Sequence, residues 1–408
     1  MQDPCDIRTG EMLHEELAAF AEFGTPSQVT ATTHAGVAVP VYVNEFWTSR
    51  QRQAHSLHEV SYRACFKPQL PRFFIERLTD EGDLVLDPFM GRGTTVIESV
   101  LLNRRAAGND INPLSPMLVT PRVKPPAMSD IEKRLAELDL AAVAEPPEEL
   151  LTFYHPDTLQ ELCGLRAVLA GSNEHVDRWI RMTATNRLTG HSKGFFSVYT
   201  LPPNQAVTVA RQRLINEKRN QQPEYRDVRR LILRKSRSLL KDVTPENLES
   251  FDKFGPSLNT GVGSADQLVH LDDESVSLVV TSPPFLDVVQ YATDNWLRCW
   301  FNGIEAAEIP IWNFRTVDEW QAAMTRVFSE LRRVLKPGGH VAFEVGEVKN
   351  GKVKLEDHVI PAGMAAGLLP ELVLINAQEF TKTANCWGID NQSKGTNTNR
   401  IVLLRKVD

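Results

Sequence analysis

The chain has 408 residues, of which 42% are hydrophobic and 24% are charged, a composition typical of a globular protein with two or three folding units. No apolar run is long enough to span a bilayer, and the first residues lack the pattern of a signal peptide, so we expect a cytoplasmic protein without membrane contact. Five scattered cysteines without a CxxC pair argue against a disulfide framework and a zinc site, so no metal is expected.

The net charge of −7 is distributed unevenly along the chain. From Trp179 to Lys241 there are fourteen Lys or Arg residues and three Asp or Glu residues, so this segment carries +11 and the remainder −18. A phosphate contact depends on the local charge rather than on the net charge. An acidic body with one basic segment is therefore compatible with nucleic-acid binding.

Residues 1–54 give a weak pattern and are interpreted as an N-terminal arm, in which the alternating apolar stretch 37–43 is a candidate edge strand. The sequence pattern is clearer at residues 55–78. Pro68 and Pro71 bracket the start of a predicted helix. Its apolar face consists of residues at helical spacing, namely Phe74, Ile75 and Leu78.

The stretch LVLDPFMGRGTTV, residues 84–96, predicts a strand, a glycine loop and a helix that together hold a ligand. Gly91 and Gly93 let the backbone approach the ligand, and the helix from Thr94 directs free N–H groups toward it. Val96 replaces the third glycine of GxGxxG and the P-loop lysine is absent, so a general nucleotide loop is a poor match.

A second strand is predicted over residues 104–110 and ends in Asp110. This acid lies seventeen residues beyond Gly93, close to the spacing at which an acid accepts hydrogen bonds from ribose hydroxyls. The alternative interpretation is an acid that caps the following turn.

Five prolines between 113 and 126 interrupt the alternation of strand and helix, and residues 125–257 are interpreted as an inserted, mainly helical module. Helices are expected at 130–143, after Thr158, at 206–220 and at 225–240. The strand pattern resumes with a strand and turn at 261–266. Residues 276–285 are interpreted as a buried strand that carries the stretch Ser-Pro-Pro-Phe at its C-terminal end. A long helical region to Leu335, a turn and strand at 336–346, and an antiparallel pair at 372–380 and 400–407 complete the chain.

Four polar residues each follow a predicted strand: Asp87, Asp110, Asp266 and Ser282. Because ligands of an open α/β sheet bind at the carboxyl ends of its strands, we expect these residues at one edge of the sheet.

The string DPFMGRGTT, residues 87–95, resembles motif I of the amino-group DNA methyltransferases, and TSPPF, residues 281–285, resembles their catalytic motif. The resemblance implies a class I, Rossmann-like α/β methyltransferase fold, divided by the insert into 55–124 and 258–408, with S-adenosylmethionine as cofactor. Residues 55–78 resemble motif X, which covers the methionine end of the cofactor, although a packing helix fits them equally well. The cofactor residues implied are Phe66, Asp87, Pro88, Phe89, Gly91, Gly93, Thr94, Thr95, Asp110 and Asp266.

The amino group of a base is a poor nucleophile, so methyl transfer to it needs acceptors that hold its hydrogens and stabilise the developing positive charge. The Ser282 hydroxyl and the Pro283 carbonyl are the expected acceptors, and the rings of Pro283 and Pro284 fix the backbone. Phe285 is expected to stack on a base flipped out of the duplex, with a core aromatic as the alternative.

Serine before Pro-Pro is usual in this family for cytosine N4, whereas Asp or Asn is usual for adenine N6, so the residues favour N4. Adenine N6, an exocyclic amine of RNA and a silent nucleic-acid-binding regulator are the alternatives. Methylation of carbon 5 needs a cysteine after a proline, and the chain offers only Pro4-Cys5.

The insert is the candidate for recognition of double-stranded DNA, because Lys and Arg neutralise phosphates and Arg reads base edges. A solvated helix face is the alternative, and the insertion lies at an unusual position for a recognition domain. A cognate restriction endonuclease is a candidate partner. The polar loop 381–400 is expected to border the base pocket through Asn385 and Trp387, or else to be merely mobile. The candidate contacts to nucleic acid are Lys193, Arg211, Arg213, Arg229, Arg230 and Arg234.

Overall fold

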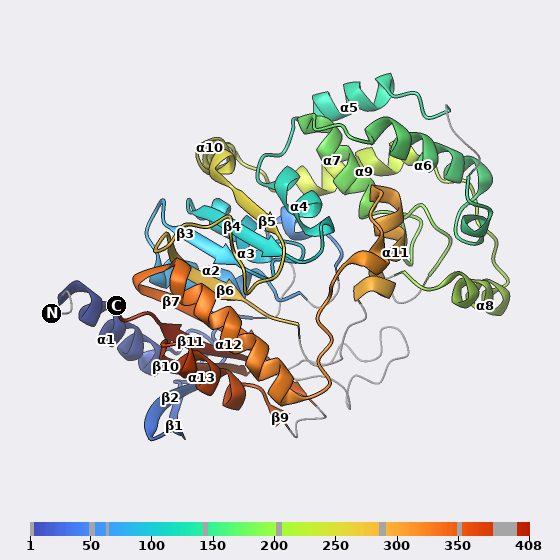
Figure 1. Ribbon diagram of the computed structural model, residues 1–408. Helices are drawn as coiled ribbons and strands as arrows, with labels where there is room; N and C mark the ends of the chain where they lie inside the picture. Colours follow the sequence, from blue (N-terminus) through green and yellow to red (C-terminus); the bar gives the residue numbers. More distant parts are fainter. Residues whose placement is uncertain are drawn as a thin grey trace.

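The computed structural model describes residues 4–48, 54–62, 65–141, 146–200, 206–284, 291–348, 353–377 and 398–408. Nine strands form one sheet in the order β1-β2-β10-β11-β7-β6-β3-β4-β5 (Figure 1). In that order the strands are β1 Gln28–His34, β2 Val37–Asn44, β10 Leu369–Ala377, β11 Thr398–Arg405, β7 Leu335–Val345, β6 Val276–Thr281, β3 Leu84–Asp87, β4 Arg105–Asp110 and β5 Asn259–Val262.

The five strands from β7 to β5 run parallel, and β11 is antiparallel to both of its neighbours, β7 and β10. The chain fills the sheet outward from β3 through β4 to β5 and then returns to β6 on the other side, so the switch point lies between β3 and β6. This order confirms the predicted α/β fold with a Rossmann-like sheet and its terminal antiparallel pair. The prediction of an edge strand at 37–43 is wrong, because β2 pairs with β10 on one side and β1 takes the edge.

The central strands are short apolar runs because both faces of the sheet are covered. Neighbouring residues of β3 show this alternation, since Val85 packs with α1 (Pro4–Ala19) and α2 (Gln69–Leu78), whereas Leu86 packs with α12 (Val317–Val334) and α13 (Glu356–Ala365). Helix α3 (Thr94–Leu101) packs against α2 and β4. A small hairpin of β8 (Glu347–Val348) and β9 (Val353–Lys354) follows β7.

Six α-helices occupy the described part of the inserted segment and lie mostly to one side of the sheet (Figure 1). The predictions at 206–220, at 225–240 and after Thr158 correspond to helices, whereas the helix expected at 130–143 ends at Glu137. The six are α5 Met128–Glu137, α6 Pro156–Leu169, α7 His175–Thr185, α8 Val209–Arg219, α9 Val228–Leu240 and α10 Pro245–Phe254.

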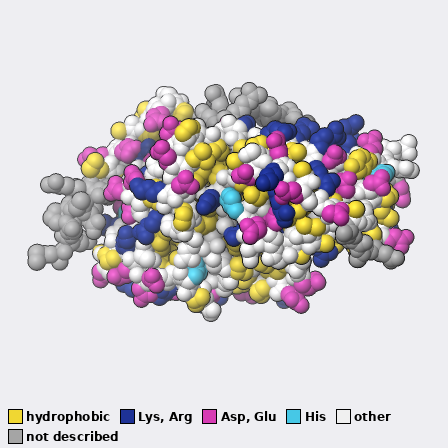
Figure 2. All heavy atoms as spheres, turned by 90° about the horizontal axis from the view of Figure 1, so that it is seen from above, with side chains coloured by type: hydrophobic (Ala, Val, Ile, Leu, Met, Phe, Trp, Pro, Cys, Tyr) yellow, Lys and Arg dark blue, Asp and Glu magenta, His cyan; other side chains and the backbone are white. Residues whose placement is uncertain are grey.

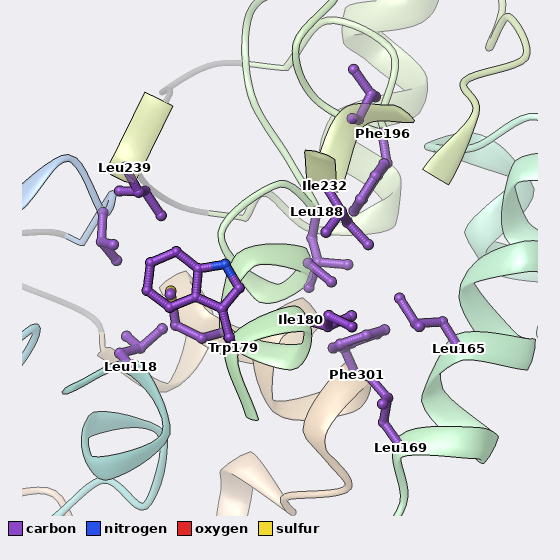
Figure 3. Close-up of a cluster of buried hydrophobic side chains, with 14 of the residues drawn as sticks. Leu118, Leu165, Leu169, Trp179, Ile180, Leu188, Phe196, Ile232, Leu239 and Phe301 are labelled. Carbon is purple, nitrogen blue, oxygen red and sulfur yellow. The ribbon is translucent and has the colours of Figure 1, made fainter. Parts of the chain in front are cut away.

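The core of these helices extends beyond the insert. In Figure 3, Trp179 of α7 lies among apolar side chains that include Leu118 of α4 (Leu114–Val119) and Phe301 of α11 (Tyr291–Asn302). Helix α10 packs on α3 at the sheet. The inserted helices therefore share one hydrophobic core with elements from both halves of the sheet domain.

The long helical region expected before Leu335 is interrupted in the structure. Between α11 and α12 the chain forms only the short 3-10 helix Ala306–Glu308 and an extended segment. Within the described residues no helix is both long enough and apolar enough to cross a bilayer.

Candidate functional site

A pocket opens at the carboxyl ends of the central strands. It brings together the glycine loop after β3, the end of β4, the turn after β5 and the end of β6, as expected for the switch point of an open α/β sheet. Of the residues predicted from the sequence, the pocket is lined by Phe66, Pro88, Phe89, Gly91, Thr94, Asp110, Ser282 and Pro284.

The glycine loop has the left-handed backbone that its sequence suggests. Gly91 and Gly93 have φ angles of +48° and +74°, and Gly93 is the residue that immediately precedes α3. A Cβ on Gly93 would lie 2.4 Å from a methyl group of Val119, on α4, so this position also requires glycine for space. Gly91 lines the pocket, whereas Gly93 does not. Gly93 therefore shapes the loop and Gly91 presents it to a ligand.

Asp110 lies where the second-strand acid was predicted, and its carboxylate is already partly engaged. The N–H of Gly91 donates to Asp110 Oδ2 at 2.8 Å, and the N–H of Asn112 donates to Oδ1 at 2.9 Å. Asp110 thus holds the glycine loop and caps the next turn, while burial raises the pKa of its carboxyl group. Each carboxylate oxygen has a second lone pair, so the residue can still accept a hydrogen bond within the pocket.

Asp87 is buried beneath the pocket rather than in its wall. Thr281 Oγ1 donates to Asp87 Oδ1 at 2.6 Å, and the N–H of Phe89 donates to the same oxygen at 3.1 Å. Burial raises the pKa of Asp87 to about 7. A second bond joins α3 to β6, because Thr95 Oγ1 donates to the carbonyl of Val280 at 2.9 Å. Asp87 and Thr95 therefore tie the glycine loop to the strand that ends in Ser282.

Two buried side chains lie behind the motif after β6. The indole N–H of Trp320, fully buried on α12, donates to the carbonyl of Pro284 at 3.0 Å. Glu344, a buried residue of β7, lies beside Ser282 on the neighbouring strand and accepts a hydrogen bond from Asn399. Phe285, Asn385 and Trp387 lie outside the described residues.

The opposite wall comes from the extended segment between α11 and α12, which the sequence led us to expect as helix. Pro310, Ile311 and Trp312 line the pocket, and the Trp312 ring lies 6.2 Å from that of Phe89 in an edge-on arrangement. Trp312 also contacts Phe314. The signal that was overlooked is a proline within an aromatic-rich segment that has no helical periodicity.

The Asp266 carboxylate forms hydrogen bonds with neighbouring side chains and does not line the pocket. Its carboxylate accepts from Arg326 Nε at 3.0 Å and from Ser264 Oγ at 2.5 Å. The neighbours Gly263, Ser264 and Ala265 form this part of the pocket wall. The acid therefore fixes the turn that these three residues use to line the site.

The candidate basic residues of the insert divide into two kinds. Arg229 is half-buried and donates to the carbonyls of Leu135 and Leu138 at 3.0 and 2.6 Å, so it closes the end of α5. Figure 2 shows Lys and Arg side chains gathered along one edge of the half formed by the inserted helices. The exposed members of the predicted set are Lys193, Arg211, Arg213, Arg230 and Arg234.

Residues 27–114 match the family model described as DNA methylase. The type II methyltransferase M.MjaII of Methanocaldococcus jannaschii is 29% identical over 89 residues, which are 22% of this chain and 16% of that protein. The type II methyltransferase M.MvaI of Kocuria varians is 30% identical over 117 residues, which are 28% of this chain and 24% of that protein. These matches thus span a quarter or less of the two relatives' length.

Among solved structures, a putative DNA modification methylase of Thermus thermophilus, complexed with S-adenosyl-L-methionine, is similar to part of the chain. The two are 22% identical over 36% of this chain and 54% of that chain, with a TM-score of 0.24. The family match itself includes the glycine loop and Asp110, whereas Ser282 lies beyond it.

Proposed function

We propose that the protein is an S-adenosylmethionine-dependent DNA methyltransferase acting on cytosine N4, because residues 27–114 match the family model described as DNA methylase. The observation that carries the proposal is that one pocket is lined by Gly91 and Asp110 of the matched segment and by Ser282 of a distant one. The cofactor site and the acceptors for an amino group then share one cavity.

The residues of the pocket fit S-adenosylmethionine. Phe66, Phe89 and Ile111 provide apolar surface for adenine, and Asp110 has lone pairs available for ribose hydroxyls. Gly91 lacks a side chain, so the space beside Tyr62 stays open. A Cβ on residue 91 would lie 3.5 Å from the tyrosine ring. When bound, the cofactor supplies an electrophilic methyl group on a sulfonium sulfur.

The protein's own contribution is to place a weak nucleophile and to accept its hydrogens. The Ser282 hydroxyl and the Pro283 carbonyl accept from the exocyclic amine, so that its nitrogen lone pair is directed at the methyl group. Trp320 holds the carbonyl of Pro284 and limits movement of this short loop. Proximity and orientation then lower the barrier to direct transfer.

Serine at position 282 supports cytosine N4 over adenine N6 within this proposal. Double-stranded DNA is the proposed substrate, and its phosphates would contact the exposed basic residues of the insert. Arg219 over the Tyr199 ring, at 3.7 Å, adds an aromatic and basic pair on this part of the chain. A cognate restriction endonuclease is the candidate partner.

The test is to incubate the protein with labelled S-adenosylmethionine and with DNA made by PCR, which carries no methyl groups, or with transcribed RNA. Hydrolysis of the product identifies the modified base, and the expected product is N4-methylcytosine in DNA. Label in N6-methyladenine would show that the target base is adenine, and label in RNA would show that the substrate is RNA. Cofactor binding without transfer to either nucleic acid would contradict the enzyme proposal.

Ser282→Ala is the matched control for this experiment. Turnover is expected to fall roughly 100-fold or more, because one of the acceptors of the reacting amine is lost. The dissociation constant for the cofactor, measured by calorimetry, is expected to remain within about two-fold, because the alanine keeps the pocket wall intact. Weak cofactor binding in this variant would argue against the role of Ser282 in the reaction itself.

A further inference from the structure

Helix α8 is covered by the rest of the protein over only a small part of its surface. Figure 1 shows it at the outer end of the inserted half, apart from α5, α6, α7 and α9. It packs on the short 3-10 helix Glu148–Thr152, and Gln212 is its one buried residue. An isolated helix of 11 residues is marginal in water, so other contacts must hold it in place.

Side-chain amides provide these contacts on one side of the helix. Gln212 Nε2 donates to the carbonyl of Tyr199 at 3.0 Å and to Asn216 Oδ1 at 2.8 Å. Asn216 Nδ2 donates to the carbonyl of Thr152 at 2.9 Å. Gln221, just beyond the helix, donates to the same two acceptors as Gln212, both at 2.9 Å. Hydrogen bonds thus fix one side of α8 and leave the opposite side exposed.

The start of α8 is fastened to α11, the helix that follows the proposed catalytic motif. The N–H of Ala206 donates to the carbonyl of Asp294 at 2.9 Å, and the indole N–H of Trp296 donates to the carbonyl of Val207 at 3.1 Å. Helix α11 begins shortly after Pro284, which lines the pocket. The exposed side of α8 is therefore held in a fixed position relative to the pocket.

This exposed side has an apolar centre between two arginines. Successive residues of a helix are rotated by about 100°, so Leu214 lies opposite the side that carries Gln212 and Asn216. The exposed fraction of Leu214 is 55%. Arg211 and Arg213 are roughly 160° apart around the axis and lie on the two flanks of Leu214. Both arginines are exposed, and no acid pairs with either of them among the described residues.

Glu217 is the one acid of α8, in a helix that has four basic residues. It is exposed and lies one turn from Leu214 on the same side. A carboxylate is repelled by DNA phosphates, but at a base edge it accepts a hydrogen bond from the amino group of cytosine. An apolar side chain beside it can contact the methyl group of thymine. Leu214 and Glu217 therefore have the chemistry of residues that read bases.

We propose that α8 is a recognition helix that lies in the major groove of duplex DNA. In this arrangement Leu214 and Glu217 face the base edges, and Arg211 and Arg213 contact phosphates on the two sides of the groove. The inference rests on the proposed function, in which duplex DNA is the substrate, and deepens it by naming the element that selects the sequence. The major groove of B-form DNA admits an α-helix, whereas side chains cannot read the deep, narrow major groove of A-form RNA.

Selection of bound duplexes tests the proposal without turnover. The protein, saturated with S-adenosylhomocysteine so that no methyl group is transferred, is incubated with a library of random-sequence DNA duplexes, and the retained duplexes are sequenced. The wild type is expected to enrich one sequence. Leu214→Ala and Glu217→Gln are each expected to reduce the preference at one or two base pairs by roughly ten-fold or more. Their melting temperatures should match that of the wild type, because both side chains are exposed.

The matched controls are Leu248→Ala and Glu249→Gln on α10. Leu248 is 47% exposed and Glu249 is also exposed, so each control removes the same groups from a helix outside the proposed interface. Both are expected to enrich the wild-type sequence. Arg211→Gln/Arg213→Gln is expected to weaken binding to all duplexes alike, because phosphate contacts carry no sequence information.

Gln212→Ala tests whether the amides hold the helix. The backbone amides of residues 209–219 are expected to exchange hydrogen faster in this variant, as measured by mass spectrometry. The preference for the enriched sequence is expected to fall, while the dissociation constant for the cofactor stays within about two-fold. Unchanged exchange together with an unchanged preference would contradict the holding role of Gln212.

The outcomes separate this proposal from the proposed function. If Leu214→Ala and Glu217→Gln both enrich the wild-type sequence unchanged, α8 does not read the bases. Tighter binding to duplex RNA than to DNA, or a wild type that enriches no sequence, would also overturn the recognition role. A DNA sequence that depends on Leu214 and Glu217, found together with no methyl transfer to any nucleic acid, would contradict only the proposed methyltransferase activity.

Discussion

Asp87 and Glu344 are two buried acids beneath the pocket, each beside a hydroxyl-bearing residue at the end of β6. Asp87 accepts from Thr281, and Glu344 lies next to Ser282 on the neighbouring strand. Neither acid lines the pocket. At the scale of single residues, the position of the proposed reaction centre thus depends on buried groups from the two strands that flank β6.

Asp87→Asn is expected to change how stability depends on pH. The pKa of Asp87 is raised to about 7 in the folded protein, so the stability linked to its protonated form is complete below about pH 4 and is lost as the pH rises through 7. The asparagine variant does not titrate. The difference between the melting temperature of the wild type and that of the variant should therefore decrease as the pH rises from 5 to 8. A constant difference between the two would contradict the assignment.

Trp320→Phe tests the hydrogen bond to Pro284. The variant keeps an aromatic ring in the core but loses the indole donor, and we expect turnover to fall roughly ten-fold with little change in cofactor affinity. The control is Phe328→Leu. Phe328 is buried on the same helix as Trp320, and its ring packs against that of Phe343. It should lower the melting temperature while its turnover per folded molecule stays near that of the wild type. Equal losses of turnover in both variants would mean that helix packing alone is being measured.

The glycine loop is an element whose shape is set by what packs behind it. Gly93 has a positive φ angle and also lies against Val119 of α4, the helix that follows Asp110. Strands β3 and β4 and helix α4 thus meet at one backbone turn. The loop is therefore sensitive to volume as well as to backbone conformation.

Gly93→Ala and Gly171→Ala form a matched pair, because their φ angles are +74° and +71° but only Gly93 lacks space. Backbone strain alone should cost Gly171→Ala roughly 1–2 kcal/mol of unfolding free energy. Gly93→Ala should cost roughly 1–3 kcal/mol more through overpacking. Chemical denaturation measures both values, and Val119→Ala added to Gly93→Ala should recover part of the excess. Equal costs at the two glycines would contradict the packing argument.

Elements with strong periodic patterns were predictable from the sequence, and elements defined by contacts between distant residues were not. Strand β6 and helix α9 were predicted at the correct positions, because burial of one face imposes a regular spacing of apolar residues that can be recognised in the sequence. The segment that contributes Trp312 lines a pocket without any periodicity. The bond between Asp87 and Thr281 joins strands far apart in the chain, so the sequence shows the acid but not its partner.

At the scale of the whole molecule, the inserted helices present a basic edge while the rest of the chain is acidic. The exposed arginines of α8, Arg211 and Arg213, are candidates for contacts with phosphates because no ion pair occupies them within the described residues. Phosphate contacts release counterions, so they appear as a slope of affinity against salt.

Arg211→Gln/Arg213→Gln is expected to weaken duplex binding at low salt and to reduce the slope of log K against log salt by roughly 2. Fluorescence anisotropy with a labelled random-sequence duplex measures this slope. Lys253→Gln, on α10 and paired with Glu81, is the control and should leave the slope unchanged. An unaltered slope in the double variant would exclude α8 from the interface.

The shared core around Trp179 bears on how such a protein can diversify. Leu118 and Phe301, which come from outside the insert, complete that core, so transplanting residues 125–257 into a relative would expose the apolar surface that these two side chains cover. We therefore expect that the segment cannot be exchanged as a cassette without loss of stability, whereas substitutions on the outer surface of its helices can be tolerated.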